Sequence, residues 1–382
     1  MTDIAQKPAS ARIPWIDVAK GLGIGLVFYG HFVERFINEG VEVAELQMKW
    51  VYCFHMPLFF LLSGLVYKDR GLKFDAFLKR QMLSRLLPAW AFNFIGVLLW
   101  LAIAGGQGAA GYVGEHGWVE TLRYAATRFG METLQGRPTF NILMWFLICL
   151  FTAELGQFAL RRALQKNWQY AVSILAFAGL TYVISAHREL VVGVLQGKLD
   201  WWHISSAIGA IVFYQVGILL QRLGWLVRKT PISLQVVLTL VFLAITVLTY
   251  NRNFPPGYKV VFLAHGAYGD ARWFFLSAFA GIGLVIYASQ LLMRLRVLSY
   301  VGTITLGLMC LNGIMHEFMN APLAAWIMGC VGQQHVFVFT LVCLAGTTVS
   351  LVAAIPVAWF MDRYLPFLFG RRFARPKLAQ KA

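Results

Sequence analysis

The chain has 382 residues, of which 59% are hydrophobic and 13% are charged, and its formal net charge is +16. A soluble domain carries about 25% charged residues, so this composition excludes a water-soluble fold and indicates a chain that lies in a bilayer. The positive charge does not indicate nucleic-acid binding, because the Lys and Arg residues lie between hydrophobic stretches on one alternating set of loops, as membrane topology requires.

Ten apolar stretches follow one another along the chain, each close to the ~20 residues needed to cross a bilayer. They lie at 15–36, 50–67, 86–104, 140–160, 168–186, 203–221, 232–250, 272–293, 299–319 and 336–361. The sequence therefore predicts an all-α fold, a polytopic transmembrane helical bundle of about ten spans. We expect an N-terminal segment 1–14, a single transmembrane domain 15–361 and a basic tail 362–382.

The basic residues predict the orientation of the bundle. Segment 68–85 and the tail are rich in Lys and Arg, whereas the loops on the other side hold most of the acidic residues, such as Glu39, Glu42 and Glu115. Cytoplasmic loops carry the excess of Lys and Arg in membrane proteins. An even number of spans and this bias together predict that both termini are cytoplasmic.

The first stretch carries three ionisable residues, Asp17, Lys20 and His31. An ionisable side chain in a span costs about 3 kcal/mol and is usually functional. At 100° per residue the three share one helix face about 60° wide, with Lys20 and His31 ~16 Å apart in depth. Asp17 and Lys20 can pair at this spacing. The alternative is an ion pair that anchors the helix end, together with a hydrogen-bonded core histidine.

Further polar residues lie in later stretches. His55 begins the second stretch at a depth comparable with that of His31, and His316 falls at the same level in the ninth. The candidates for lining a polar cavity or contacting an acceptor are His55, Ser63, Glu154, Asn312 and His316. His is a common metal ligand, but no H-x-x-x-H or H-E-x-x-H spacing occurs, so we expect no metal site and no bound cofactor. Each residue could instead be satisfied locally within the bundle.

Two segments between stretches are long, 105–139 and 251–271. Long loops in compact proteins are usually functional lids or disordered. Their aromatic residues, which include Tyr112, Trp118, Phe140 and Tyr258, suit a sugar or a lipid headgroup. They equally suit the aromatic belts found at membrane interfaces.

Three motifs resemble one known family. Lys20 and His31 are separated by ten residues, the second stretch begins with the run 54–64 (FHMPLFFLLSG), and segment 77–88 contains Lys79-Arg80 and Arg85-Leu86-Leu87-Pro88. The resemblance is to the membrane acyltransferase-3 family, in particular its fucose 4-O-acetylase-like branch. It extends from residue 12 to about residue 360 and is strongest over 12–88.

This resemblance implies a membrane-bound O-acyltransferase, expected to be an O-acetyltransferase of a bacterial inner membrane. It would move an acyl group from cytoplasmic acyl-CoA, with acetyl-CoA as co-substrate, to a hydroxyl of a glycan or lipid-linked sugar, as in exopolysaccharide modification. His31 would be a general base or an acyl carrier, with Asp17 and Lys20 setting the local field. Lys79, Arg80 and Arg85 would bind the donor phosphates.

One alternative function is a transporter or flippase for a lipid-linked sugar. It would also need ten helices and a polar cavity, but its activity would not depend on acyl-CoA. The sequence leaves the acceptor, the acyl group and the oligomeric state open.

Overall fold

The computed structural model describes residues 13–37, 40–102, 109–188, 198–227, 230–253, 255, 257–331 and 336–371. Segment 1–12, and most of the tail predicted at 362–382, lie outside the described residues. Within the described ranges the regular structure is helical, and the only β pairing is an isolated bridge between Phe262 and Ala267. The predicted all-α class is therefore confirmed.

The helices follow the predicted stretches closely. The first half of the chain forms α1 (Pro14–Ile37), α2 (Glu42–Tyr52), α3 (His55–Leu65), α4 (Phe74–Gln81), the π-helix η1 (Met82–Leu86), α5 (Leu87–Ala102), α6 (Ala109–Gln135), the 3₁₀-helix η2 (Ile142–Met144), α7 (Trp145–Leu160) and α8 (Asn167–Ala186).

The second half forms η3 (Lys198–His203), α10 (Ile204–Arg222), η4 (Trp225–Val227), α11 (Ile232–Thr249), η5 (Tyr250–Arg252), η6 (Leu263–His265), α12 (Ala271–Leu291), α13 (Arg296–Thr303), α14 (Thr305–Met315), the π-helix η7 (His316–Asn320), α15 (Ala321–Val331), α16 (Val336–Tyr364) and η8 (Pro366–Phe369).

Nine helical segments of the described chain are long and apolar enough to cross a membrane, and a bent pair makes a tenth. That pair, Arg296–Thr303 with Thr305–Gly329, is bent by 79°. The bundle of about ten spans is confirmed, and the predicted stretch 299–319 is not one straight helix but is bent between Thr303 and Thr305.

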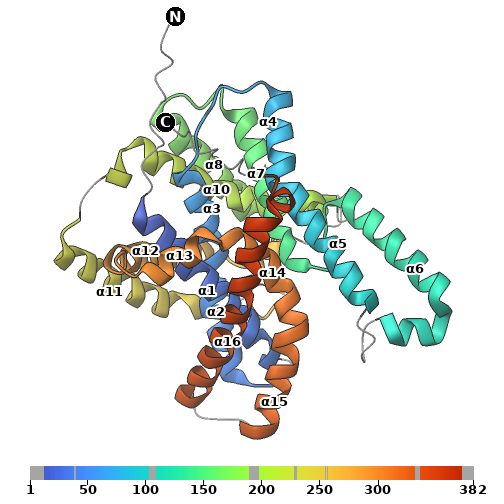
Figure 1. The fold of residues 1–382 in the computed structure, drawn as a ribbon. Coiled ribbons are helices and arrows are strands. Elements are labelled where there is room, and N and C mark those ends of the chain that lie inside the picture. Colours follow the sequence, from blue (N-terminus) through green and yellow to red (C-terminus); the bar gives the residue numbers. More distant parts are fainter. Residues whose placement is uncertain are drawn as a thin grey trace, which may run out of the picture.

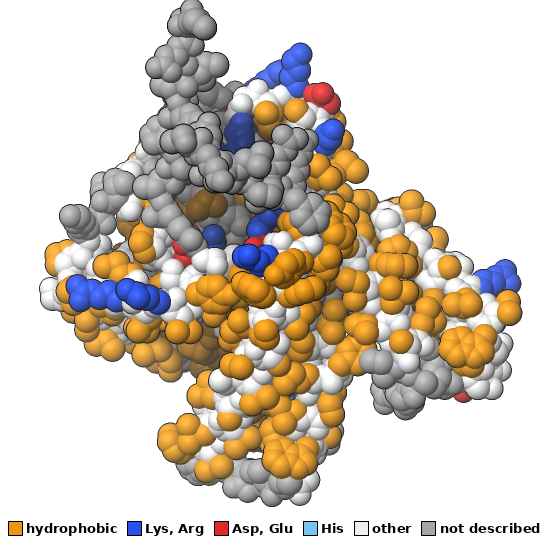
Figure 2. Space-filling view, viewed as in Figure 1, with side chains coloured by type: hydrophobic (Ala, Val, Ile, Leu, Met, Phe, Trp, Pro, Cys, Tyr) orange, Lys and Arg blue, Asp and Glu red, His pale blue; other side chains and the backbone are white. Residues whose placement is uncertain are grey.

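Exposure separates central from peripheral spans. The spans Glu42–Leu65 and Asp200–Arg222 are 83% and 72% buried inside the protein, whereas Asn167–Ala186 and Ile232–Arg252 are only 17% buried. Large apolar side chains cover these outer helices and the flanks of α15 and α16, while the visible Lys and Arg side chains lie mainly toward the α4 end and the edges (Figure 2). Such broad apolar surfaces suit contact with lipid.

Glycines permit the close packing of α1. A Cβ at Gly302 of α13 would collide with the backbone carbonyl oxygen of Asp17, and one at Gly21 would collide with that of Leu298. Small residues let transmembrane helices approach closely. The first helix is therefore held closely against α13. Farther along α1, His31 lies near His316 of η7.

The segment between α5 and α7 differs from the predicted loop. Its described part is mostly helix α6, which is kinked at Gly117, where φ is 77°. With α5 it forms an arm that projects to one side of the bundle (Figure 1). Its opening glycines Gly105, Gly106 and Gly108 lie outside the described residues.

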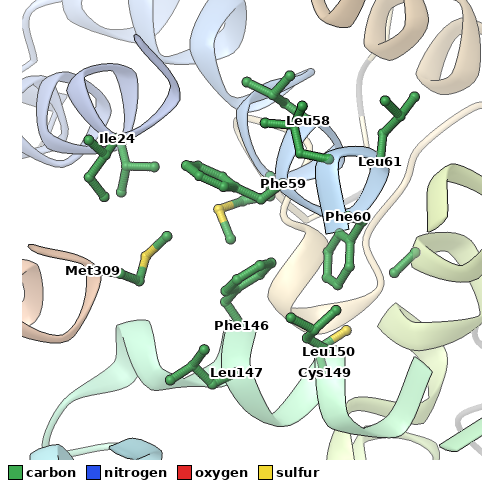
Figure 3. Close-up of a cluster of buried hydrophobic side chains, with 14 of the residues drawn as sticks. Ile24, Leu58, Phe59, Phe60, Leu61, Phe146, Leu147, Cys149, Leu150 and Met309 are labelled. Carbon is green, nitrogen blue, oxygen red and sulfur yellow. The ribbon is translucent and has the colours of Figure 1, made fainter. Parts of the chain in front are cut away.

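A dry apolar layer occupies the centre of the bundle. Phe59 and Phe60 of α3 point toward Phe146 of α7, with Ile24 of α1 and Met309 of α14 beside them (Figure 3). Phe60 and Phe146 have ring centroids 5.0 Å apart. This layer, referred to below as the apolar layer, separates two cavities.

Candidate active site

His31 lies in a small cavity between α1, α3, η2 and η7. The cavity has a volume of about 110 Å³ and is called the His31 cavity here. Its polar lining residues are His31, Glu34, Tyr52, His55, His316 and Glu317. The three histidines that the sequence placed at one depth thus line one cavity.

Glu34 and Tyr52 surround the His31 ring. Nδ1 of His31 lies 2.8 Å from Oε2 of Glu34, and an ionised carboxylate only accepts, so Nδ1 donates to it. The hydroxyl of Tyr52 donates to the same carboxylate oxygen at 3.2 Å. Within the described residues Nε2 of His31 has no hydrogen-bond partner. A carboxylate that fixes the tautomer in this way leaves the other imidazole nitrogen available to take a proton.

Gly30 leaves the space that Tyr52 occupies beside His31. A Cβ at Gly30 would lie 2.9 Å from Cε2 of Tyr52, so any larger residue would push the tyrosine away from the helix. The rings of His31 and Tyr52 meet edge to face with centroids 5.9 Å apart.

The π-helix η7 supplies the opposite wall. Nδ1 of His316 donates to the backbone carbonyl of His31 at 3.0 Å, and the two rings lie 5.4 Å apart. Nη2 of Arg35 donates to the carbonyl of His316 at 2.6 Å and pairs with Glu317 at 2.9 Å. Single-turn π-helices often occur at functional sites, since the wider turn re-aims side chains. Here it brings His316 and Glu317 to the cavity.

His55 and a loop complete the cavity. Nδ1 of the buried His55 donates to the carbonyl of Val51 at 2.9 Å. Residues 261–264, within the long segment 251–271, also line the cavity, and Phe262 stacks on Tyr52. Burial lowers the pKa of His265 in this loop, which keeps its imidazole neutral at pH 7.

Asp17 and Lys20 lie at the other end of α1. Nζ of Lys20 is 4.0 Å from Oδ1 of Asp17, so the two form the pair that their spacing allows. Neither residue lines the His31 cavity. Lys20 and His31 are eleven positions apart along the helix, a rise of ~16 Å. The structure therefore does not bring the three first-helix residues together.

A second cavity lies beyond the apolar layer, at the α4 end. It has a volume of about 160 Å³, is called the basic cavity here, and shares no lining residue with the His31 cavity. Its charged lining residues are Lys68, Asp69, Arg70, Arg80, Arg85, Glu154 and Arg161. Five basic residues against two acidic ones suit a phosphorylated ligand.

The predicted donor-binding residues differ in their surroundings here. Arg80 lines the basic cavity, whereas Lys79 is exposed and does not line it. Arg85 forms a two-pronged pair with Glu154, at 2.9 Å from Nη2 to Oε1 and 3.2 Å from Nε to Oε2. Ser63 and Glu154 thus lie in the basic cavity and not beside His31.

Asn312 lies one turn before His316 and lines neither cavity. It is fully buried, and neither atom of its side-chain amide has a hydrogen-bond partner in the described structure.

Sequence spacing predicted no metal site, but three residues of the His31 cavity meet the geometric requirement for one. Ligand atoms of His31, Glu34 and His316 all lie within 4.8 Å of one another. Metal binding would compete with the hydrogen bond from His31 to Glu34, because both use the same carboxylate.

Sequence reasoning missed Glu34 and Tyr52. Glu34 follows His31 by three residues, which places both on one helix face, and this spacing was a usable signal. Tyr52 reaches the site through the packing of α2 against α1, which no local pattern in the sequence indicates.

A family model described as an acyltransferase domain, that of the acyltransferase-3 family, matches residues 13–355. Comparisons with curated proteins and with solved structures find no match. The family match includes the whole of both cavities and points to a membrane acyltransferase. The chain belongs to the acyltransferase-3 family.

Proposed function

We propose that the protein transfers an acyl group, most simply acetyl, from acyl-CoA to a hydroxyl of a glycan or lipid-linked sugar. The observation that carries this proposal is the hydrogen bond of 2.8 Å from His31 to Glu34 inside a cavity of an acyltransferase-3 fold. The expected setting is a bacterial inner membrane, with the basic cavity on the cytoplasmic side.

His31 acts as the general base. Its Nε2 takes the proton of the acceptor hydroxyl while the oxygen attacks the thioester carbonyl, and Glu34 stabilises the imidazolium that forms. The new C–O bond forms, the C–S bond breaks, and the proton passes from His31 to the departing thiolate. General-base catalysis of this kind contributes about 10²–10⁴-fold.

The basic cavity binds the donor phosphates. Arg80, Arg70 and Lys68 surround it, and charge-assisted hydrogen bonds favour phosphate. Arg85 keeps its buried partner Glu154 and acts as a positioning residue. The acyl end of the donor crosses the apolar layer beside Phe59 and Phe146 to reach His31.

The test uses the purified full chain in lipid vesicles with radiolabelled acetyl-CoA and an envelope-glycan extract. Wild-type protein is expected to label the glycan, and His31→Ala to lose this activity by at least about 100-fold. His187→Ala is the control, because His187 is exposed and lines none of the described cavities.

Labelling by His31→Ala at the wild-type rate would overturn the assignment of the base. A transporter or flippase would instead move a lipid-linked sugar in vesicles without acyl-CoA, and its rate would not depend on His31. Absence of acetyl-CoA-dependent labelling by an otherwise folded wild type would overturn the enzyme proposal itself.

A further inference from the structure

A third and larger cavity adjoins the His31 cavity on the side of the α5–α6 arm. It has a volume of about 700 Å³ and is called the arm cavity here. Ile142, His316 and Glu317 line both cavities, so the two meet at η2 and η7. Ligand sites usually have volumes of about 300–1,000 Å³, and the arm cavity falls within this range.

Aromatic side chains form much of its wall. The rings of Trp100 and Tyr124 lie 6.0 Å apart, and those of Trp100 and Phe140 lie 5.7 Å apart. The guanidinium of Arg128 lies over both Tyr124 and Phe140, at 5.7 and 5.9 Å from the ring centroids. These rings offer flat apolar faces beside hydrogen-bond donors, which suits a molecule with both apolar and hydroxylated surfaces.

A buried carboxylate holds Arg128 in place. Oε1 of Glu132 accepts from Nε of Arg128 at 3.0 Å, and Oε2 accepts from the backbone N–H of Thr139 and from the side chain of Asn93. Nη1 of Arg128 donates to the hydroxyl of Tyr124. Among the described residues Nη2 has no partner, so a fixed donor remains beside the aromatic wall.

Asn141 forms a fixed part of the cavity wall. This residue is 2% exposed and lines the cavity, and its Oδ1 has no hydrogen-bond partner in the described structure. Its Nδ2 donates to the carbonyl of Cys310 at 3.0 Å, which fixes the amide. Gly313 lies beside Oδ1, and a Cβ there would collide with it. This oxygen has almost no exposed surface and faces Gly313, so Asn141 fixes the cavity wall and offers no open acceptor.

We propose that the arm cavity binds the acceptor saccharide, with a sugar ring against Trp100 and Tyr124 and a sugar hydroxyl bonded to Arg128. The proposal rests on the function proposed above and locates its second substrate. The acceptor hydroxyl then enters the His31 cavity between Ile142 and His316, while the donor arrives from the opposite side through the apolar layer.

The charges around the cavity indicate which kind of saccharide fits. Arg128 is neutralised by Glu132, and Glu317 by Arg35. The lining therefore carries little net charge, and we infer a saccharide whose bound unit is uncharged. Such a unit could belong to a lipid-linked sugar or to a free glycan.

The experiment compares variants expressed in the native host lacking the chromosomal copy, supplied with a labelled acetyl source. Label is counted in the extracted polymer and in the solvent-extractable, lipid-linked sugar fraction. The purified variants are assayed in parallel for acetyl-CoA hydrolysis without acceptor.

Trp100→Ala is expected to lower glycan labelling about tenfold relative to its own hydrolysis rate, as for the loss of one aromatic contact. Ile314→Trp, which fills the cavity, is expected to have the same effect. Trp118→Ala is the matched control on the same arm, since Trp118 is 58% exposed and lines none of the described cavities.

Wild-type labelling by both Trp100→Ala and Ile314→Trp would overturn the proposal. An equal fall in labelling and hydrolysis would also overturn it, because it would show a structural effect and no acceptor role. Early label in the lipid-linked fraction identifies a lipid-linked acceptor, and label in polymer alone identifies a free glycan; either supports the cavity assignment. Loss of hydrolysis in His31→Ala tests the enzyme proposal separately.

Discussion

The basic cavity and the His31 cavity lie toward opposite ends of the same two helices. Ser63 and Glu154 mark the basic end of α3 and α7, whereas Met56 and Trp145 mark the other end. At the basic end several cations surround one buried ion pair. At the other end a single carboxylate holds one imidazole, whose second nitrogen has no bond to a described residue. The difference shows that the cluster of cations and the paired imidazole are kept apart within one helix pair, which suits the separate roles in binding and proton transfer proposed for them.

Among the substitutions that test whether binding and proton transfer are separate, Glu34→Gln is expected to have the largest effect. The amide no longer stabilises the imidazolium or favours the reactive tautomer, so kcat is expected to fall at least about 100-fold. The KM for acetyl-CoA should not change, because we propose that the donor phosphates bind at the other cavity. Steady-state kinetics of the vesicle-bound enzyme measure both constants.

Glu45→Gln is the control, since Glu45 pairs with Lys49 on α2 and does not line the His31 cavity. A raised KM with unchanged kcat would contradict the role of Glu34.

The second effect concerns stability at the basic end. Glu154→Leu leaves the Arg85 cation without its buried partner and is expected to lower the free energy of unfolding by about 3–5 kcal/mol. The double variant Arg85→Met/Glu154→Leu should recover most of this loss, because no unpaired charge remains. Titration with SDS in mixed micelles measures the free energy.

The exposed pair of Arg123 and Glu120 provides the control for this measurement. Glu120→Leu should change stability by no more than about 1 kcal/mol, as is usual for surface pairs. If the double variant proves as unstable as Glu154→Leu, the loss comes from packing and not from the uncompensated charge.

The next prediction has a smaller expected effect and tests whether the basic cavity binds the donor. Arg80→Ala should raise the KM for acetyl-CoA about tenfold by removing one charge-assisted contact, with kcat unchanged. Lys79→Ala is the adjacent control, since Lys79 is exposed and outside the cavity. Equal effects of the two substitutions would mean that general positive charge, and not the cavity, attracts the donor.

The smallest expected effect is that of metal removal. EDTA should leave the rate of the wild type unchanged, because the mechanism uses Glu34 as a hydrogen-bond acceptor. Added Zn²⁺ should inhibit by binding His31, Glu34 and His316, and EDTA should reverse this inhibition. Loss of activity in EDTA that Zn²⁺ restores would instead make the triad a catalytic metal site.

The sequence predicts more of the fold than of the site. Apolar length alone located each candidate span among the described residues, because a bilayer imposes that length on any helix that crosses it. The bend between α13 and α14 was not predicted, since it depends on how α13 packs against α1 at Gly302. Segment 109–135 lies within a predicted loop, because its apolar residues are too few for a span, yet it is helical.

In the site, helical geometry correctly put His31, His55 and His316 at one depth, because depth follows directly from residue number. It could not pair Arg85 with Glu154, which are 69 residues apart and meet only through the packing of η1 against α7. The face shared by Asp17, Lys20 and His31 was a correct feature of one helix. A shared face does not imply one site, because Lys20 and His31 have similar angles around the helix axis but lie ~16 Å apart along it.

The apolar layer has a consequence for the membrane as an electrical barrier. His31 and Glu34 lie on one side of the layer, and the charged residues of the basic cavity lie on the other. Water that joined the two groups would provide a route for protons. Phe59, Phe60 and Phe146 occupy that gap, about 10 Å along α3 between Met56 and Ser63. A thioester and its chain can pass such a seal by displacing rings, while a hydrated ion would have to shed its water. Under the proposed function, the residues that the donor must pass would therefore also preserve the membrane potential between turnovers.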